Sequence, residues 1–171
     1  DISGLPFFYN EEDIGDFHNR IIYYEPAEAA RTGAATVSPP LIKRYVCAAG
    51  ELVEKELQFF LDKKVPQVKF VDRTFNCDHK HAMGIWKYIK EHDNGITNFI
   101  FEISADILKE EELAILQSLR PGLVQLEIGG TVHEPQKIEE ISAAWTGNGF
   151  GRLLPLSGKK ENIHIHLDLI A

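Results

Sequence analysis

Residues 67–72 read Gln-Val-Lys-Phe-Val-Asp, and residues 97–104 read Thr-Asn-Phe-Ile-Phe-Glu-Ile-Ser; both stretches are predicted strands. Between them, Asn76 or Asp78 is placed to cap a helix that runs to about His92, because a short polar side chain accepts hydrogen bonds from the first free amides of a helix. The Asp-Asn-Gly turn at 93–95 ends this helix. A strand, a helix and a second strand at this spacing predict a βαβ unit.

The same alternation continues in both directions along the chain. Apolar residues at helical spacing predict a helix over 51–64, which Pro66 ends. A helix with a Glu-rich first turn is predicted over 108–119, where the acidic groups suit the helix dipole. The other predicted elements are strands at 21–25, 123–129 and 163–170, and the start of a helix at 138–141.

The order of these elements predicts an α/β fold of parallel βα repeats. Apolar runs such as residues 99–101, Phe-Ile-Phe, fit strands that are buried on both faces of a parallel sheet. Four or five such units form either a doubly wound sheet or part of a (βα) barrel. The periodicity of the chain does not choose between these two architectures.

Composition limits the classes of function. The chain has 171 residues, which suits one domain, and its 44% hydrophobic and 26% charged content is typical of a water-soluble globular protein. No apolar run approaches the ~18 residues of a membrane span, and no signal sequence precedes the first strand. A net charge of −8 disfavours nucleic acid as a partner. Two cysteines form no disulfide framework, so we expect a cytoplasmic protein.

One segment interrupts the alternation. Residues 27–40 are Ala-rich, end in two prolines and lack periodicity, so as written this stretch is predicted to be a loop. Back-translation with the reading frame started one nucleotide earlier permits Ser-Arg-Gly-Cys-Pro-Tyr-Arg-Cys-Ser-Tyr-Cys-Leu over residues 27–38. Its three cysteines fall at Ala30, Ala34 and Val37 and have the spacing Cys-x3-Cys-x2-Cys. We infer a frameshift that is later restored.

Two further patches are predicted to be displaced in frame, at residues 130–134 and 143–158. The first follows Leu126-Glu127-Ile128-Gly129, and in the shifted frame it continues as Val-Gln-Ser. The second decodes over 143–151 as Arg-Arg-Met-Asp-Trp-Glu-Arg-Leu-Arg, which is a better helix than the written, glycine-rich sequence.

The cysteine spacing, the stretch 69–76 and the Glu-Ile-Gly run at 127–129 together resemble the radical S-adenosylmethionine superfamily. Residues 166–171 also resemble a strand that precedes a Gly-Leu-Pro turn in that family. The resemblance is greatest to the cobalamin-binding iron–sulfur oxidoreductases, the group that includes the anaerobic magnesium-protoporphyrin IX monomethyl ester cyclase. It implies that residues 18–171 are a fragment of a (βα)6 radical-SAM-type barrel, truncated at its C-terminus. Residues 1–17 would then be a linker from a missing cobalamin-binding domain.

The resemblance also implies a chemistry. In this family three thiolates hold a 4Fe-4S cluster, an electron donor of the flavodoxin or ferredoxin type reduces it, and S-adenosylmethionine is cleaved to a radical that attacks a small-molecule substrate. Cobalamin would come from the missing domain. The protein with the amino-acid sequence as given, here called the written chain, lacks the three cysteines of the shifted frame. We therefore expect the written chain to be inactive. By position at strand ends, the residues implied to bind the cofactor are Asp72, Glu102, Glu127, Gly129 and Asp168.

Two other groups of residues suggest different chemistry. His164 and His166 are two apart on a predicted strand and therefore share a face, as in metal-dependent hydrolases built on βα barrels. Residues 77–81, Cys-Asp-His-Lys-His, contain metal-ligating types, but they lie at a helix start, where histidines two apart diverge. A third alternative is a non-catalytic remnant, because displaced segments would remove buried contacts.

Overall fold

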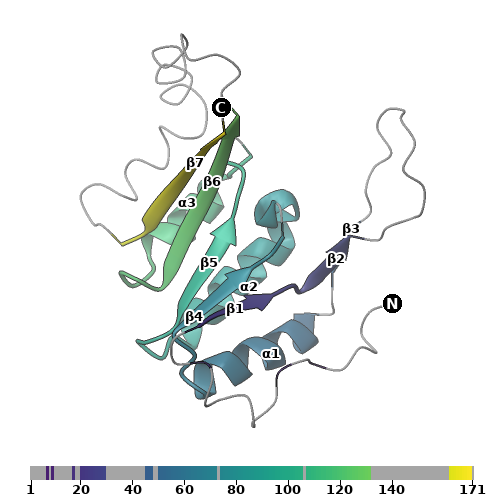
Figure 1. Ribbon diagram of the computed structural model, residues 1–171, viewed down its shortest axis with the longest axis vertical. Helices are drawn as coiled ribbons and strands as arrows, with labels where there is room; N and C mark the ends of the chain where they lie inside the picture. Colours follow the sequence, from purple (N-terminus) through teal and green to yellow (C-terminus); the bar gives the residue numbers. More distant parts are fainter. Residues whose placement is uncertain are drawn as a thin grey trace.

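The computed structural model describes residues 7, 9, 17, 20–29, 45–47, 50–72, 74–105, 107–131 and 162–170. Within these ranges the main sheet is entirely parallel, and its strands stand in the order β1-β4-β5-β6-β7 (Figure 1). Strand order in space therefore follows strand order in the sequence, without a reversal. The strands are β1 (Ile21–Tyr24), β4 (Gln67–Phe70), β5 (Asn98–Glu102), β6 (Val124–Thr131) and β7 (His164–Ile170).

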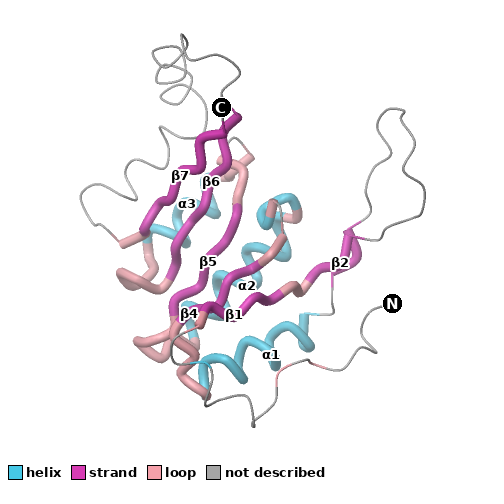
Figure 2. The backbone as a smooth tube through the Cα atoms, viewed as in Figure 1, coloured by secondary structure: helices cyan, strands magenta, loops and turns pink. Residues whose placement is uncertain are grey.

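The helices α1 (Gly50–Asp62), α2 (His79–Glu91) and α3 (Glu110–Gln117) alternate with these strands and cover one face of the sheet (Figures 1 and 2). The ring of Tyr24 on β1 lies 5.5 Å from that of Phe60 on α1, and Phe101 on β5 lies 6.1 Å from Trp86 on α2. Helix α2 also contacts α1 and α3. The predicted α/β class with parallel βα repeats is confirmed, and the described part lacks the reversal that defines a doubly wound sheet.

Local sequence explains where α2 begins and ends. The carboxylate of Asp78 accepts hydrogen bonds from the backbone amides of Lys80 and His81, at 3.0 and 3.1 Å, as predicted for an N-cap. The turn that follows the helix uses Gly95, whose φ of 75° lies in the region that a side chain disfavours. Asp93 accepts a hydrogen bond from the Gly95 amide at 2.9 Å.

Helix α1 is shorter than predicted. It ends at Asp62 rather than near residue 64, because Lys64 adopts a left-handed conformation with φ of 53° before Pro66. Its apolar stripe is buried as the spacing predicted, with Val53, Leu57, Phe60 and Leu61 at 2% exposure or less.

The two faces of the sheet differ in character. On the helix-covered face the side chains are apolar and buried, among them Val68, Phe70, Phe99 and Phe101. The opposite face, here called the open face, alternates with it along each strand and is largely polar. Its described side chains include Tyr23, Lys69, Ile100, Glu102, Gln125, Glu127, His164 and His166.

The segment that interrupts the alternation begins and ends in strands. β2 (Ala27–Ala29) pairs antiparallel with β3 (Tyr45–Cys47), with Ala27 opposite Cys47. The loop predicted over residues 27–40 is therefore wrong for residues 27–29, and β3 lies beyond that loop, in a stretch for which no strand was predicted. Backbone pairing between two extended arms needs no particular side chains, so the sequence pattern did not indicate it. Residues 30–44, including all three positions of the shifted-frame cysteines, lie outside the described residues.

Aromatic residues from the predicted linker, residues 1–17, belong to the core. The ring of Phe7 lies 5.2 Å from that of Phe59 and 5.6 Å from that of Phe60. Tyr9 contacts Phe17, which is only 5% exposed. These described side chains extend the aromatic layer over α1 and β1.

Several sequence predictions fall on other parts of the chain. The helix start at 138–141 and the frame patch at 143–158 lie outside the described residues, and of the patch at 130–134 only the first two residues are described, as the end of β6. In the described ranges no helix has the length and apolar character needed to cross a lipid bilayer.

Candidate functional site

Strand register brings polar residues from five strands into rows on the open face. Tyr23 stands opposite Lys69, Lys69 opposite Ile100, Ile100 opposite Gln125, and Gln125 opposite His164. This row crosses the whole sheet. It provides a cation, an amide, an imidazole and a phenol on one surface.

A second row lies two residues closer to the carboxyl ends of the strands. Glu102 on β5 is directly opposite Glu127 on β6, which in turn is opposite His166 on β7. Two carboxylates in register on one face repel each other unless a cation lies near them. A positive charge near Glu102 and Glu127 would therefore stabilise this part of the sheet.

Lys69, in the first row, supplies this positive charge. Its Nζ lies 2.7 Å from Oε2 of Glu127, so the side chain spans the intervening strand β5 from β4 to β6. The hydrogen bond to Glu127 raises the pKa of Lys69, against the effect of burial, and the charge of Glu102 raises it further. Beneath this bridge Ile100 is only 3% exposed, although it points to the open face. Lys69, Glu102 and Glu127 thus form a connected, half-buried charged group.

Asp72 follows β4 but does not join this group. By alternation it belongs with Phe70, on the helix-covered side, and not with Lys69 on the open face. Burial raises the pKa of its carboxyl to about 6, and the nearby charge of Glu25 adds to the effect. Its Oδ2 is buried and has no hydrogen-bond partner among the described residues. Asp72 is thus a half-buried carboxyl at the end of a strand, where a perturbed pKa is a recurrent feature of functional sites.

The remaining implied cofactor residues lie one row further along. Gly129 on β6 is in register with Asp168 on β7, immediately beyond the pair of Glu127 and His166. The structure therefore brings Glu102, Glu127, Gly129 and the backbone of Asp168 to one end of the sheet. It places Asp72 at the same end but on the other side. The description of Asp168 stops at its backbone.

The two histidines of the alternative site share the open face, as predicted from their spacing. His164 and His166 are both exposed and stand opposite Gln125 and Glu127. Among the described residues, no three His, Cys, Asp or Glu side chains converge in a way that could hold a metal ion.

The residues of the run 77–81 separate from one another. His79 Nδ1 lies 3.0 Å from Oε1 of Glu112, a carboxylate that is 1% exposed at the start of α3. Cys77 is exposed, whereas His81 is half-buried between α1 and α2. His79 lies toward Glu112 of α3 and His81 lies toward α1, which explains why residues close in the sequence do not form a cluster.

Sequence reasoning missed Lys69, Tyr23 and Gln125 as members of the site. A signal for them was available, because each alternates with buried apolar neighbours in a predicted strand. Attention to strand ends alone selected four carboxylates and Gly129, and it passed over the polar side chains inside the strands.

No protein-family model matches this chain, and no curated protein sequence matches it either. The class that the described structure itself defines is an α/β protein with a parallel sheet, helices on one face and a charged open face.

Proposed function

We propose that this chain is part of a (βα)6 barrel of the radical S-adenosylmethionine type, that its open face binds an S-adenosylmethionine-like ligand, and that the written chain does not cleave that ligand. The observation that carries the proposal is the topology of the described part of the chain: five parallel strands stand in sequence order, and the helices α1, α2 and α3 lie on one face of their sheet (Figure 1). A barrel wall has this order, because each βα unit adds its strand beside the last. Residues 30–44 follow β1 and β2 and precede α1, where the resemblance expects the cluster segment.

The open face supplies chemistry that suits such a ligand. S-adenosylmethionine carries an ammonium group, a sulfonium and ribose hydroxyls, and carboxylates attract or accept hydrogen bonds from these groups. Glu102 and Glu127 lie side by side at the carboxyl end of the sheet, which is the functional end of βα barrels. Lys69 neutralises part of their charge through its ion pair with Glu127, and its ammonium group has further donors that we expect to contact the carboxylate of a ligand.

The iron–sulfur cluster of the family does not fit the written residues. Ala30, Ala34 and Val37 stand at the three cysteine positions, and their methyl groups cannot ligate iron. When bound in related enzymes, the cluster supplies the electron that cleaves the sulfonium. The written chain is therefore proposed to bind without reaction, as a non-catalytic relative of the family.

The cluster part of the proposal is tested by restoring the thiolates. The triple variant Ala30→Cys, Ala34→Cys, Val37→Cys is reconstituted with iron and sulfide without oxygen, beside a matched triple serine variant and the written chain. We expect about four irons per chain and a broad cluster absorbance in the cysteine variant only. Stoichiometric iron and sulfide in the written chain, or none in the cysteine variant while circular dichroism reports a folded protein, contradicts the proposal.

The binding part is tested on the written chain by calorimetric titration with S-adenosylmethionine. Glu102→Gln and Glu127→Gln should each weaken binding about fivefold to tenfold, because each removes a charge-assisted contact. Glu91→Gln, at the exposed end of α2, is the matched control and should bind like the parent. Equal affinity in all four proteins would place the ligand away from the open face.

The inferred frameshifts are tested separately, in the nucleotide sequence of the gene. Resequencing of codons 26–50, 129–135 and 142–159 should reveal single-base insertions and deletions relative to the restored frame. A verified open frame exactly as translated, with no compensating changes in related genes, would leave the non-catalytic remnant as the simpler explanation.

A second candidate function is metal-dependent hydrolysis, which the shared face of His164 and His166 favours. Imidazole nitrogens are ligands that zinc accepts, and because no third His, Cys, Asp or Glu side chain of the described residues converges with this pair, a further ligand would have to come from elsewhere. Zinc bound in stoichiometric amount by the written chain, and lost in His164→Ala, would favour this function. Zinc retained by that variant would exclude the pair as ligands.

A further inference from the structure

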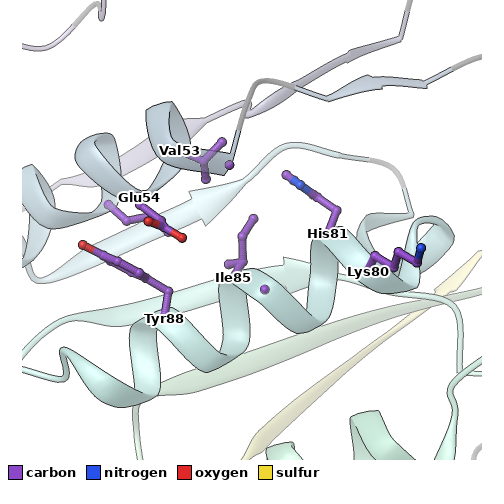
Figure 3. A pocket seen from close by; sticks show the side chains of 9 residues that line it. Val53, Glu54, Lys80, His81, Ile85 and Tyr88 are labelled. Carbon is purple, nitrogen blue, oxygen red and sulfur yellow. The ribbon is translucent and has the colours of Figure 1, made fainter.

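A groove lies on the helix-covered side of the molecule, between α1 and α2 (Figure 3). Its volume of about 120 Å³ is roughly ten times what one water molecule needs, so it has room for a ligand of about ten non-hydrogen atoms. Its walls come close to the backbone at Gly50 and Gly84, where an added Cβ would meet no atom within 4 Å. The groove exists because each helix presents a glycine to the gap.

The middle of the groove is apolar. Val53 and Leu57 of α1 and Ile85 of α2 line it, and Figure 3 shows Val53 and Ile85 between the two ends. These side chains are at most 4% exposed, so the floor excludes water well. An aliphatic segment of a ligand would gain about 25 cal/mol for each Å² of apolar surface it buries there.

One end of the groove is negative. Figure 3 shows the carboxylate of Glu54 beside the ring of Tyr88. Burial raises the pKa of Tyr88, and the charges of Glu54 and Asp62 raise it further, which reports a negative potential at this ring. The Tyr88 hydroxyl donates to Gln58 at 2.9 Å, and this contact holds the ring in place. An ammonium group suits this end.

The other end is lined by the imidazole of His81, and a ligand reaches the buried Nε2 atom of this ring only if the ring turns toward the groove. Nε2 of His81 is buried and has no hydrogen-bond partner among the described residues. Burial lowers the pKa of His81 despite the nearby charge of Asp78, so the ring is neutral at pH 7 and donates from only one nitrogen. Lys80 also lines this end, and Figure 3 shows its side chain extending away from His81, so its ammonium group adds positive charge from the rim of the groove. A carboxylate suits this end.

The distance between the ends selects the kind of ligand. His81 and Tyr88 are seven residues apart on α2, which corresponds to about 10 Å along the helix. An α-amino acid holds its two charges on one carbon and cannot reach both ends. An extended chain covers ~3.5 Å for every three bonds, so about seven bonds bridge the gap once side-chain reach is allowed for.

We infer that the groove between α1 and α2 binds a linear ω-amino carboxylic acid, with its ammonium at Glu54 and Tyr88 and its carboxylate at His81. The aliphatic chain of this ligand then lies over Val53 and Ile85. The groove uses the helix side of the sheet, and so the inference does not rest on the function proposed for the open face.

The probe for the test is 6-aminohexanoate, titrated into the full chain and followed by the amide resonances of Gly50 and Gly84. A ligand of this size is expected to bind at about a millimolar. Hexanoate and hexylamine each lack one charged end and should bind at least fivefold more weakly, and 3-aminopropanoate is too short to reach both ends. Absence of any shift, or equal affinity of all four compounds, overturns the inference.

Single-residue variants test whether the groove is the binding site and whether each of its ends binds the charged group proposed for it. Gly84→Leu projects into the groove from a position where an added Cβ meets no atom within 4 Å, and it should abolish binding. Lys87→Ala, on the same helix outside the groove, is the matched control and should leave binding unchanged. Glu54→Gln should weaken binding threefold to fivefold, and His81→Phe about tenfold. Thermal unfolding checks that each variant is folded. Full affinity in a folded Gly84→Leu protein contradicts the proposed site.

Discussion

Replacing Asp72 by Asn tests the electrostatics at the end of β4. Burial raises the pKa of the Asp72 carboxyl from 3.8 to about 6, so the folded protein holds its charge at a cost. At about 1.4 kcal/mol for each pH unit between the two pKa values, the cost is about 3 kcal/mol when both states are ionised. Because Asp72 is only half-buried, water screens the charge, and we discount this figure to about 1.5 kcal/mol.

The sign follows from proton binding. Between pH 3.8 and about 6 the folded state binds more protons at Asp72 than the unfolded state, so stability falls as the pH rises through this window. Asp72→Asn removes the ionisation. The variant should therefore unfold with a free energy about 1–2 kcal/mol higher than the parent at pH 7, and this gain should vanish below pH 4.

Urea denaturation at pH 4, 5, 6 and 7 measures the difference directly, and Glu25→Gln separates the contribution of the neighbouring charge from that of burial. A variant that is no more stable than the parent at pH 7, or a gain of the same size at every pH, refutes the reasoning. If the gain appears, Asp72 is a carboxyl kept at the expense of stability, which is the usual condition of residues retained for binding.

Three further predictions concern stability. Arg120 donates to both carboxylate oxygens of Asp93, at 2.6 and 3.0 Å, and this hydrogen bonding lowers the pKa of Asp93. Asp93→Asn should therefore lower the free energy of unfolding by about 0.5–1 kcal/mol at pH 7, measured by urea denaturation. This loss should disappear as the pH falls below the ordinary pKa of an aspartate and then through the lowered pKa of Asp93, because the parent carboxyl is then protonated as well. Asn76 is fully buried and bonds both backbone groups of Ser104 at 2.9 Å, so Asn76→Ala should cost about 2–4 kcal/mol; a cost below 1 kcal/mol would mean that water replaces the amide. Gly84→Ala should raise the melting temperature, with a gain of about 0.5–1 kcal/mol, because the added Cβ meets open space on an exposed helix face; a lower melting temperature would contradict the free volume described there.

Local patterns predicted most of the described elements of this protein, namely the strands of the main sheet and the helices between them. The predicted strands and helices correspond to β1, α1, β4, α2, β5, α3, β6 and β7, with differences at their ends. The end of α1 was predicted two residues late, because the spacing of apolar residues does not reveal the left-handed backbone conformation of Lys64. The pair β2 and β3 was missed because backbone pairing holds it, and a pattern of side chains does not record that.

Candidate site residues were harder to predict than elements. The pairing of Lys69 with Glu127 joins residues that are 58 positions apart in the sequence and lie on either side of an intervening strand. No spacing of residues along the chain predicts this contact. Asp72 was grouped with Glu102 and Glu127 because all three end strands, yet a shift of one residue past a strand reverses the side of the sheet. The groove between α1 and α2 depends on where two helices cross, which their separate sequences do not state.

By itself, the sequence determined the α/β class, the parallel βα repeats and the polar alternation in the strands, since the periods of two and 3.6 residues are properties of neighbouring positions. Only the tertiary structure decided that strand order runs without a reversal, that all three helices lie on one face, and which charges meet on the other. The physical reason is that a right-handed crossover places its helix on the face that is set by the side on which the next strand is added, and the amphipathic pattern of the helix is the same in either case. Contacts between segments, here those of Tyr24 with Phe60 and of Phe101 with Trp86, hold the helices on that face.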